Sequence, residues 1–273
     1  MEKHPFDIAL DLLPMAPGVY SGATTASYRN MIGPFGGVTA ATALNAVLQH
    51  PALMGQPISL TVNYAGPLAA GAFKVTATPR RTNRSTQHWV IELTQEDKDG
   101  VDEAMLTGTA VTGTRRPTWS GDDSALPSVP RPDDLPESSP ISAVEWINRY
   151  DMRFIEGKFP THWDGSGKTS LSQLWMRDRP PRPLDFCSLA SMADIFFPRV
   201  YLRRALPVPV GTVSMTVYFH ADGAQLTQSG TGFLLGQARA QAFRNGFFDQ
   251  TAQLWSEAGL LLATTHQIVY FKE

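Results

Sequence analysis

The sequence has one cysteine, few charged residues for its length and no long apolar run. Cys187 alone cannot form a disulfide within the chain or a cysteine-based metal cluster, which fits a reducing compartment. Lys and Arg total 23 against 25 Asp and Glu, without a basic block, so nucleic acid is not expected as a partner. No segment is typical of a membrane span, a secretory signal or a transit peptide. We therefore expect a cytoplasmic protein with no membrane partner.

Several common catalytic motifs are also missing. There is no G-x-S-x-G elbow for a serine nucleophile, and the six histidines show no metal-ligand spacing such as H-E-x-x-H, so neither a metal nor a cofactor is expected. HWDGSGKTS, residues 162–170, lacks the first glycine of a phosphate-binding loop, because His162 stands there, and is interpreted as a flexible turn. Cys187 is interpreted as a small core residue, and His220 and His266 as hydrogen-bonded histidines in or near the core.

What the sequence does contain is an internal duplication. Residues 114–140 are rich in Pro, Ser and Asp without apolar periodicity, and predict a linker between an N-terminal repeat, 1–113, and a C-terminal repeat, 141–273. ISLTVNY at Ile58 matches VSMTVYF at Val213, an offset of 213 − 58 = 155. GVDEAMLTGTAV at Gly100 matches GLLLATTHQIVY at Gly259, an offset of 259 − 100 = 159. The drift of four residues predicts a loop insertion.

Each repeat predicts a helix followed by an antiparallel meander. The helices are expected from Gly36-Gly37 to Pro51 and over 185–197, where Pro198 ends the second. The strands are expected near 58–65, 71–79, 86–96 and 102–112, and near 211–220, 231–241, 245–256 and 260–271, with one more before each helix at 18–28 and 147–156. A long helix wrapped by a curved antiparallel sheet is the hotdog arrangement, so the fold class is α+β, a double hotdog. A lipocalin-like barrel or a two-sheet fold remains the alternative.

Asp194 is the residue that most needs an explanation. In SLASMADIFFPRV it falls at the edge of an apolar helical stripe, where a carboxylate needs partners because desolvation of a charge is costly. Gln267 interrupts an otherwise apolar strand near the C-terminus, and Thr212 opens the strand TVSMTVYFH. If helix and strands pack as in a hotdog, these three side chains converge on one water molecule and activate it for attack on a carbonyl.

Two further sets of residues are candidates for binding. Gly36 and Gly37 stand at a helix start, where backbone N–H groups and the helix dipole favour an oxyanion, although the glycines also allow close packing against the sheet. Arg80, Arg81 and Arg84 lie together in a predicted turn, where they either contact phosphates or form a solvated loop.

These motifs resemble the acyl-CoA thioesterase II, or TesB-like, family of double-hotdog proteins over nearly the whole chain. The resemblance rests on GPFGGVTAATAL, RRTNRSTQHWV, RPLDFCSLASMADIFF, GTVSMTVYFH and GLLLATTHQIVYF. It implies hydrolysis of acyl-CoA in fatty acid metabolism, with catalytic roles for Asp194, Thr212 and Gln267. It also implies that the chain forms a homo-oligomer. With acyl-CoA as the substrate, the phosphates that Arg80, Arg81 and Arg84 are candidates to contact are those of coenzyme A, and a solvated loop stays the alternative.

Two departures from the family pattern leave other functions open. Val38 follows Gly36-Gly37 where the family pattern has Gln, and the segment between Asp194 and Thr212 is short, which predicts a reshaped acyl pocket. A non-catalytic acyl-CoA or lipid binder is therefore one alternative. An acyl-CoA hydratase or dehydratase is another, but the second helix has no Asp-x-x-x-x-His pairing to support it.

Overall fold

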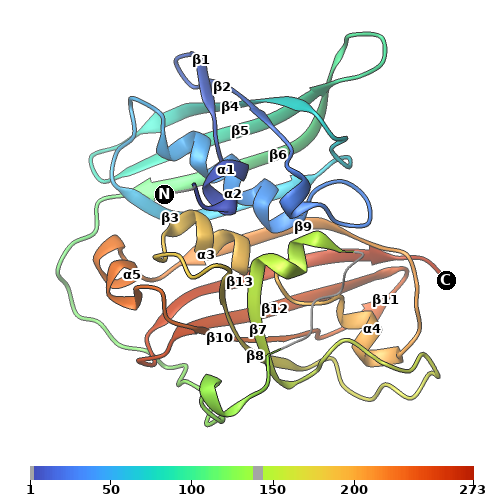
Figure 1. Cartoon of the computed structure of the whole chain (residues 1–273). Helices are drawn as coiled ribbons and strands as arrows, with labels where there is room; N and C mark the ends of the chain where they lie inside the picture. Colours follow the sequence, from blue (N-terminus) through green and yellow to red (C-terminus); the bar gives the residue numbers. More distant parts are fainter. Residues whose placement is uncertain (1–2, 138–143) are drawn as a thin grey trace.

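The computed structural model describes residues 3–137 and 144–273, and shows two similar halves side by side on one continuous antiparallel sheet (Figure 1). The strand order is β1-β2-β4-β5-β6-β3-β9-β13-β12-β10-β8-β7, with β11 paired to β12. The first six strands in this order belong to the N-terminal half and the rest to the C-terminal half. The expected double hotdog is confirmed, and the alternative folds are wrong.

Most of the predicted helices and strands are present, but the strand expected over 18–28 ends at Ala23, and residues 26–28 form a 3₁₀ turn. In the N-terminal half they are α1 (Pro5–Ala9), β1 (Leu13–Ala16), β2 (Val19–Ala23), η1 (Ala26–Tyr28), α2 (Gly36–Leu48), β3 (Gln56–Tyr64), β4 (Ala72–Thr82), β5 (Thr86–Glu96) and β6 (Asp102–Gly113). In the C-terminal half they are β7 (Tyr150–Glu156), β8 (Ser172–Asp178), α3 (Phe186–Met192), α4 (Arg199–Arg204), β9 (Val210–Phe219), α5 (Gly223–Ser229), β10 (Leu234–Arg239), β11 (Phe243–Arg244), β12 (Phe247–Ser256) and β13 (Leu261–Phe271). Two 3₁₀ turns, η2 (Pro132–Asp134) and η3 (Glu145–Arg149), lie between the halves in sequence.

The two halves are joined at the pair β3–β9. Thr61 and Thr216 lie opposite each other in this ladder, and their hydroxyl oxygens are 3.0 Å apart. Their separation, 216 − 61 = 155, equals the first offset found in the sequence. Equivalent residues that pair with each other must lie on a two-fold axis, so the pseudo-dyad of the molecule passes between these two threonines.

The sequence offset of 159 does not hold in the structure, where two matching β-bulges give the true correspondence of the last hairpins. Met105 is the unpaired residue of the β5–β6 hairpin and Leu262 that of the β12–β13 hairpin, which gives an offset of 262 − 105 = 157 instead of 159. Between the turn and the bulge, β6 makes three pairs whereas β13 makes one. The first pair of strands is therefore two residues longer at the tip of its hairpin. Aligning the turn glycines Gly100 and Gly259 consequently shifts the strands by two residues.

Helices α2 and α3 lie next to each other against the sheet (Figure 1). α2 begins at Gly36 as predicted, but the second helix does not reach residue 197. α3 ends at Met192, because the following N–H groups of Asp194 and Ile195 bond three residues back, to Ser191 and Met192, and this tightens the chain into a turn. Pro198 starts the separate helix α4. Asp194 thus lies in the turn after the helix, and not on its face.

The predicted linker is not a free tether where the structure describes it. The indole N–H groups of Trp175 and Trp255 donate to the carbonyls of Pro130 and Ser124, at 2.9 and 3.4 Å. Leu126, Val129 and Leu135 of this segment pack against the hydrophobic cluster that contains both tryptophans. Residues 138–140 at the end of the predicted linker, and 141–143 at the start of the predicted second repeat, lie outside the described residues. The linker therefore covers the side of β8, β10 and β12 that faces away from α3.

The segment 162–170 and the apolar character of the helices can also be compared with the predictions. Residues 162–170 form an irregular loop, as expected, and the following strand is β8. None of the helices in residues 3–137 and 144–273 combines the length and the apolar character needed to cross a membrane.

Candidate active site

The turn after α3 brings Asp194 to the last strand of the sheet. Asp194 is half-buried, and its Oδ1 accepts a hydrogen bond from Gln267 Nε2 at 2.9 Å, although 73 residues separate the two in sequence. Gln267 is buried on the helix side of β13, and its Nε2 is also 3.3 Å from Met215 Sδ on β9. Two of the three predicted catalytic residues are thus joined directly.

Thr212 lies close by in the ladder but is not bonded to this pair. It stands opposite Val269, whereas Met215 stands opposite Gln267, with a bulge between the two pairs. Paired residues of antiparallel strands point to the same face, so Thr212 shares the face of Val269 and hence that of Gln267. In the described part of the chain its hydroxyl makes no hydrogen bond to Asp194 or Gln267.

The start of α2 closes the other side of Asp194. A Cβ atom on Gly36 would lie 2.7 Å from Asp194 Oδ2, so only glycine allows the carboxylate this close. The backbone N–H of Gly37 faces the carboxylate and lowers its pKa. A Cβ atom on Gly37 would lie 2.4 Å from the carbonyl oxygen of Ser191, which shows that α2 and α3 touch backbone to backbone. The close packing expected of the glycines is present here, and their role as donors to an oxyanion stays a prediction.

The surroundings of Asp194 set its pKa near neutrality. Burial raises the pKa to about 7, and the hydrogen bonds from Gln267 and Gly37 oppose this shift only in part. A carboxyl group with this pKa is a proton acceptor over the physiological range, because an appreciable fraction is ionised and the ionised form is basic enough to take a proton from water.

Tyr64 is a residue of the site that the sequence did not reveal. Its hydroxyl donates to the carbonyl oxygen of Gly36 at 2.9 Å and lies near Asp194. Burial and the Asp194 charge both raise the pKa of Tyr64, so it is a neutral donor. It fixes the first turn of α2 against β3. A tyrosine at the end of a strand is commonplace, and nothing in its spacing from the predicted trio points to this contact.

The predicted arginine cluster is far from this site. Arg80 and Arg81 belong to β4 and not to a turn, and Arg81 Nε bonds Asn83 Oδ1 at 2.8 Å, while Arg84 lies in the turn that follows. The strands β5, β6, β3 and β9 separate β4 from β13 in the sheet. Five strand spacings amount to about 24 Å, so the structure does not bring these arginines to Asp194.

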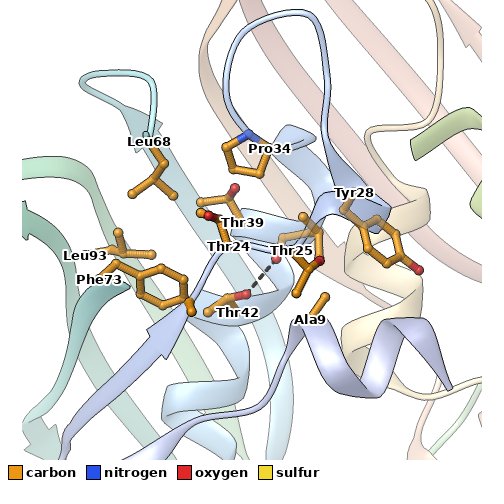
Figure 2. A pocket seen from close by; sticks show the side chains of 12 residues that line it. Ala9, Thr24, Thr25, Tyr28, Pro34, Thr39, Thr42, Leu68, Phe73 and Leu93 are labelled. Atoms are coloured by element: carbon orange, nitrogen blue, oxygen red, sulfur yellow. Dashed lines mark hydrogen bonds between the residues drawn. The ribbon is translucent and has the colours of Figure 1, made fainter. Parts of the chain in front are cut away.

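A hollow lies on another side of α2, next to its first two turns (Figure 2). One wall of the hollow is formed by Val38, Thr39 and Thr42 of α2. The volume of the hollow is about 20 Å³. Asp194 and Gln267 are not among its lining residues. Val38 is 5% exposed and belongs to this wall.

The remaining titratable candidates are not part of the Asp194 site. Burial raises the pKa of the Cys187 thiol, which makes it a poor nucleophile. His220 and His266 are not in the core as expected; both are exposed, His220 hydrogen-bonded to Thr264 and His266 paired with Asp249 at 3.5 Å. Residues 3–137 and 144–273 contain no group of three or more His, Cys, Asp or Glu side chains that could hold a metal ion.

Comparisons with known proteins match both halves. The acyl-CoA thioesterase N-terminal domain matches residues 25–113, and the acyl-CoA thioesterase C-terminal domain matches residues 123–271. A hot dog fold protein of unknown function from Alicyclobacillus acidocaldarius is 44% identical with a TM-score of 0.93, covering 100% of this chain and 99% of that one. An acyl-CoA thioesterase II from Mycobacterium marinum is 21% identical with a TM-score of 0.77, covering 98% of each chain, and shows the same fold. No curated protein matches the sequence.

Proposed function

Because the chain belongs to the acyl-CoA thioesterase family, we propose that it hydrolyses an acyl-CoA to a free acid and coenzyme A, using water activated by Asp194, Thr212 and Gln267. The family supports thioester hydrolysis in general. The observation that carries the more specific proposal is the hydrogen bond from Gln267 to a carboxyl group whose pKa is about 7, at the start of a helix.

Asp194 is the general base in this proposal. Its carboxylate accepts a proton from a water molecule as the water oxygen attacks the thioester carbonyl carbon. The C–S bond then breaks, the thiolate of coenzyme A leaves, and the proton held by Asp194 returns to sulfur. Only the ionised carboxylate can accept the proton, so the rate should rise with pH through about 7 and level off above it.

The neighbouring groups orient this chemistry. The Gln267 amide holds one carboxylate oxygen of Asp194, which limits the direction from which water can approach. Thr212, on the same face of the sheet, offers a hydroxyl to the water. The N–H of Gly36, at the positive end of the 13-residue helix α2, is the backbone donor assigned to the developing oxyanion, while that of Gly37 is directed at Asp194.

The proposal extends to assembly and location. Phe247, Ile268 and Tyr270 are 48%, 41% and 36% exposed, and they lie together on the face of β12 and β13 that points away from the helices, with Phe247 opposite Tyr270. Apolar side chains of this size in a group favour contact with another protein surface, and we assign that surface to a homo-oligomer. A role in fatty acid metabolism in the cytoplasm is consistent with acyl-CoA as the substrate and with the free thiol of Cys187.

The test is thioester hydrolysis by the parent and two variants. Asp194→Asn should lower kcat for a panel of acyl-CoA thioesters by about 10²–10⁴-fold, as expected for loss of a general base, measured as thiol release. Asp164→Asn, which removes an exposed carboxylate from the loop at 162–170, is the matched control and should leave kcat unchanged.

The alternatives have distinct outcomes. If the parent binds acyl-CoA but releases no thiol from any member of the panel, the chain is a non-catalytic binder. If it instead adds water to an enoyl-CoA, it is a hydratase. No histidine in the described part of the chain is hydrogen-bonded to Asp194, so the acid–base pair that hydration would need is not formed there.

A further inference from the structure

The position of Asp194 depends on the residue that ends the last turn of α3, Ser191. The backbone N–H of Asp194 donates to the carbonyl oxygen of Ser191 at 3.2 Å. A Cβ atom on Gly37 would lie 2.4 Å from the same oxygen. Ser191 therefore contacts both the backbone of the proposed general base and the start of α2. A shift of Ser191 would move the carboxyl group relative to the N–H groups of that helix.

The side chain of Ser191 is held by Tyr150. The two hydroxyl oxygens are 2.8 Å apart, and Ser191 and Tyr150 are 0% and 2% exposed. Inside a protein a hydrogen bond is electrostatically stronger than in water, because the local dielectric is low. Tyr150 is the first residue of β7, the last strand in the order of the described sheet. The bond thus ties the end of α3 to the edge of the sheet.

The ring of Tyr150 reaches the other helix as well. It packs edge-on against Phe35, the residue that precedes α2, with ring centroids 6.1 Å apart. Phe35 in turn stacks on Trp146 at 4.1 Å. Tyr150 therefore contacts the start of α2 with its ring and the end of α3 with its hydroxyl. These are the two helix ends that meet at Asp194.

The charge of Asp194 acts on Tyr150. Burial raises the pKa of Tyr150 well above its usual value, and the charges of Asp178 and Asp194 raise it further. The tyrosine is therefore neutral and keeps its hydroxyl hydrogen. Tyr64, on β3, is also neutral under the influence of the same carboxylate. Neither tyrosine neutralises the charge of Asp194, so the contribution of Tyr150 is to the geometry of the site.

We propose that Tyr150 and Ser191 are positioning residues for thioester hydrolysis, because the bond between their hydroxyl groups holds the end of α3, and with it the Asp194 carboxyl group, against the start of α2. This inference rests on the proposed function. It adds two residues that act through Asp194 and not on the substrate. One of them comes from the edge of the sheet.

A double-mutant cycle tests the pair. Tyr150→Phe keeps the aromatic packing and removes only the hydroxyl, so kcat for acyl-CoA should fall about tenfold while KM changes little. Ser191→Ala removes the same bond and should give the same loss. The double variant should be no slower than either single variant, because each change already breaks the bond. Losses that multiply would overturn the proposal.

Tyr28→Phe is the matched control. Tyr28 is fully buried, its ring centroid is 6.3 Å from that of Tyr150, and its hydroxyl has no hydrogen-bond partner among the residues that the structure describes. Its loss should leave kcat unchanged. Tm shows that each variant is folded. A Tyr150→Phe protein with a lower Tm but an unchanged kcat would give Tyr150 a purely structural role and overturn the proposal.

The titration of Asp194 separates this inference from the proposed function. Gln267 and the Gly37 N–H lower the pKa of Asp194, so a carboxyl group that is held less firmly but stays buried should titrate at a higher pH in Tyr150→Phe. Carbon NMR of the carboxyl group measures this midpoint without substrate.

The two ideas can then fail separately. A parent protein that releases no thiol, with a midpoint that rises in Tyr150→Phe but not in Tyr28→Phe, keeps the positioning pair and loses the proposed function. A parent that hydrolyses acyl-CoA, with a kcat and a midpoint that Tyr150→Phe does not change, keeps the function and loses the positioning pair.

Discussion

The two halves of the molecule share one architecture, yet within residues 3–137 and 144–273 the polar site at Asp194 has an apolar counterpart across the pseudo-dyad. The central offset of 155 relates Tyr64 to Phe219, and the helix starts at 36 and 186 relate Gly36 to Phe186. Where Tyr64 donates to Gly36, its counterpart Phe219 packs edge-on against Phe186 with ring centroids 5.6 Å apart. The same positions thus hold a hydrogen bond on one side and an aromatic contact on the other.

The remaining members of the site show the same contrast. Asp194 corresponds to Leu44 by the helix offset of 194 − 44 = 150, and Gln267 corresponds to Ala110 by the bulge offset of 267 − 110 = 157. Thr212 corresponds to Pro57, since 212 − 57 = 155. Desolvated polar groups destabilise a fold unless they are paired, so a side without a polar site is more stable when it is filled with apolar groups. The comparison teaches that the fold does not need the polar residues of this site, and that the polar side is kept at a cost in stability.

The largest expected effect removes the polar side. Gln267→Leu should lower kcat for acyl-CoA about 10²-fold, because a carboxylate without its orienting amide no longer directs water to the carbonyl. The counterpart substitution Ala110→Ser should leave kcat unchanged, because it lies on the apolar side. Thiol release measures both, and an unchanged kcat in Gln267→Leu would contradict the role of the amide.

The second prediction concerns the pH dependence of stability. The folded-state pKa of Asp194 is raised to about 7, so the stability associated with its neutral form is present at low pH and is lost as pH rises towards 7. At about 1.4 kcal/mol per pH unit, ionisation of Asp194 should lower the free energy of unfolding of the parent by about 2.5 kcal/mol between pH 5 and pH 8. Asp194→Asn should lack this loss. Urea unfolding at the two pH values measures this difference.

Asp178 provides the internal reference for that measurement. Burial raises its pKa to about 6, so it has a pH dependence of the same sign in a shorter range, and Asp194→Asn leaves that part in place. Parallel pH profiles for the parent and the variant would contradict the raised pKa of Asp194.

The third prediction tests the contact between the two helices. Gly37→Ala should destabilise the fold by about 2 kcal/mol, because the new Cβ atom would meet the carbonyl oxygen of Ser191 and push α3 away from α2. The counterpart Cys187→Ala makes a buried side chain smaller and should cost less. Thermal unfolding compares the two, and a Tm unchanged by Gly37→Ala would show that the helices can separate freely.

The fourth prediction makes the two sides alike at one position. Tyr64→Phe reproduces the residue type of Phe219 and removes the donor to the Gly36 carbonyl, so stability should fall by about 1 kcal/mol. Since that hydroxyl holds the start of α2, kcat should fall as well, whereas KM should change little. A variant with unchanged kcat would limit Tyr64 to a structural role.

The smallest effect is expected on the axis itself. Thr61→Val removes the hydroxyl contact with Thr216 but keeps a β-branched side chain in the strand, so the loss should be about 0.5 kcal/mol, seen by urea unfolding. Thr216→Val should give the same value within error, because the two residues are equivalent. Unequal losses would show that the pseudo-symmetry does not extend to the energetics of this pair.

Most of the fold could be predicted because its elements have strong local patterns. Strands such as β5 and β13 alternate clearly, and Gly36-Gly37 marks the start of α2. The end of α3 could not be predicted, because its apolar periodicity continues through Ile195-Phe196-Phe197 although the chain has already turned. The bulges at Met105 and Leu262 are set by tertiary packing, so the sequence alignment missed them.

The site was only partly accessible from the sequence. Asp194 attracted attention as a carboxylate among apolar residues, but its contact with Gln267 depends on the turn after α3, and the pairing of the two came chiefly from the family resemblance. Tyr64 was missed because its role depends on where α2 begins in space. The arginines at 80, 81 and 84 looked like a phosphate site because they are close in sequence, whereas the sheet places four strands between β4 and β13.

The seam at Thr61 and Thr216 has a consequence for how such a molecule can change. In a dimer of identical chains, every substitution appears twice, once on each side of the axis, so a residue that improves packing on one side alters the chemistry on the other. Within a single polypeptide, each side can be substituted without changing the other. One side can then accumulate phenylalanine, leucine and proline for rigidity while the other retains ionisable groups, and selection on turnover no longer opposes selection on folding.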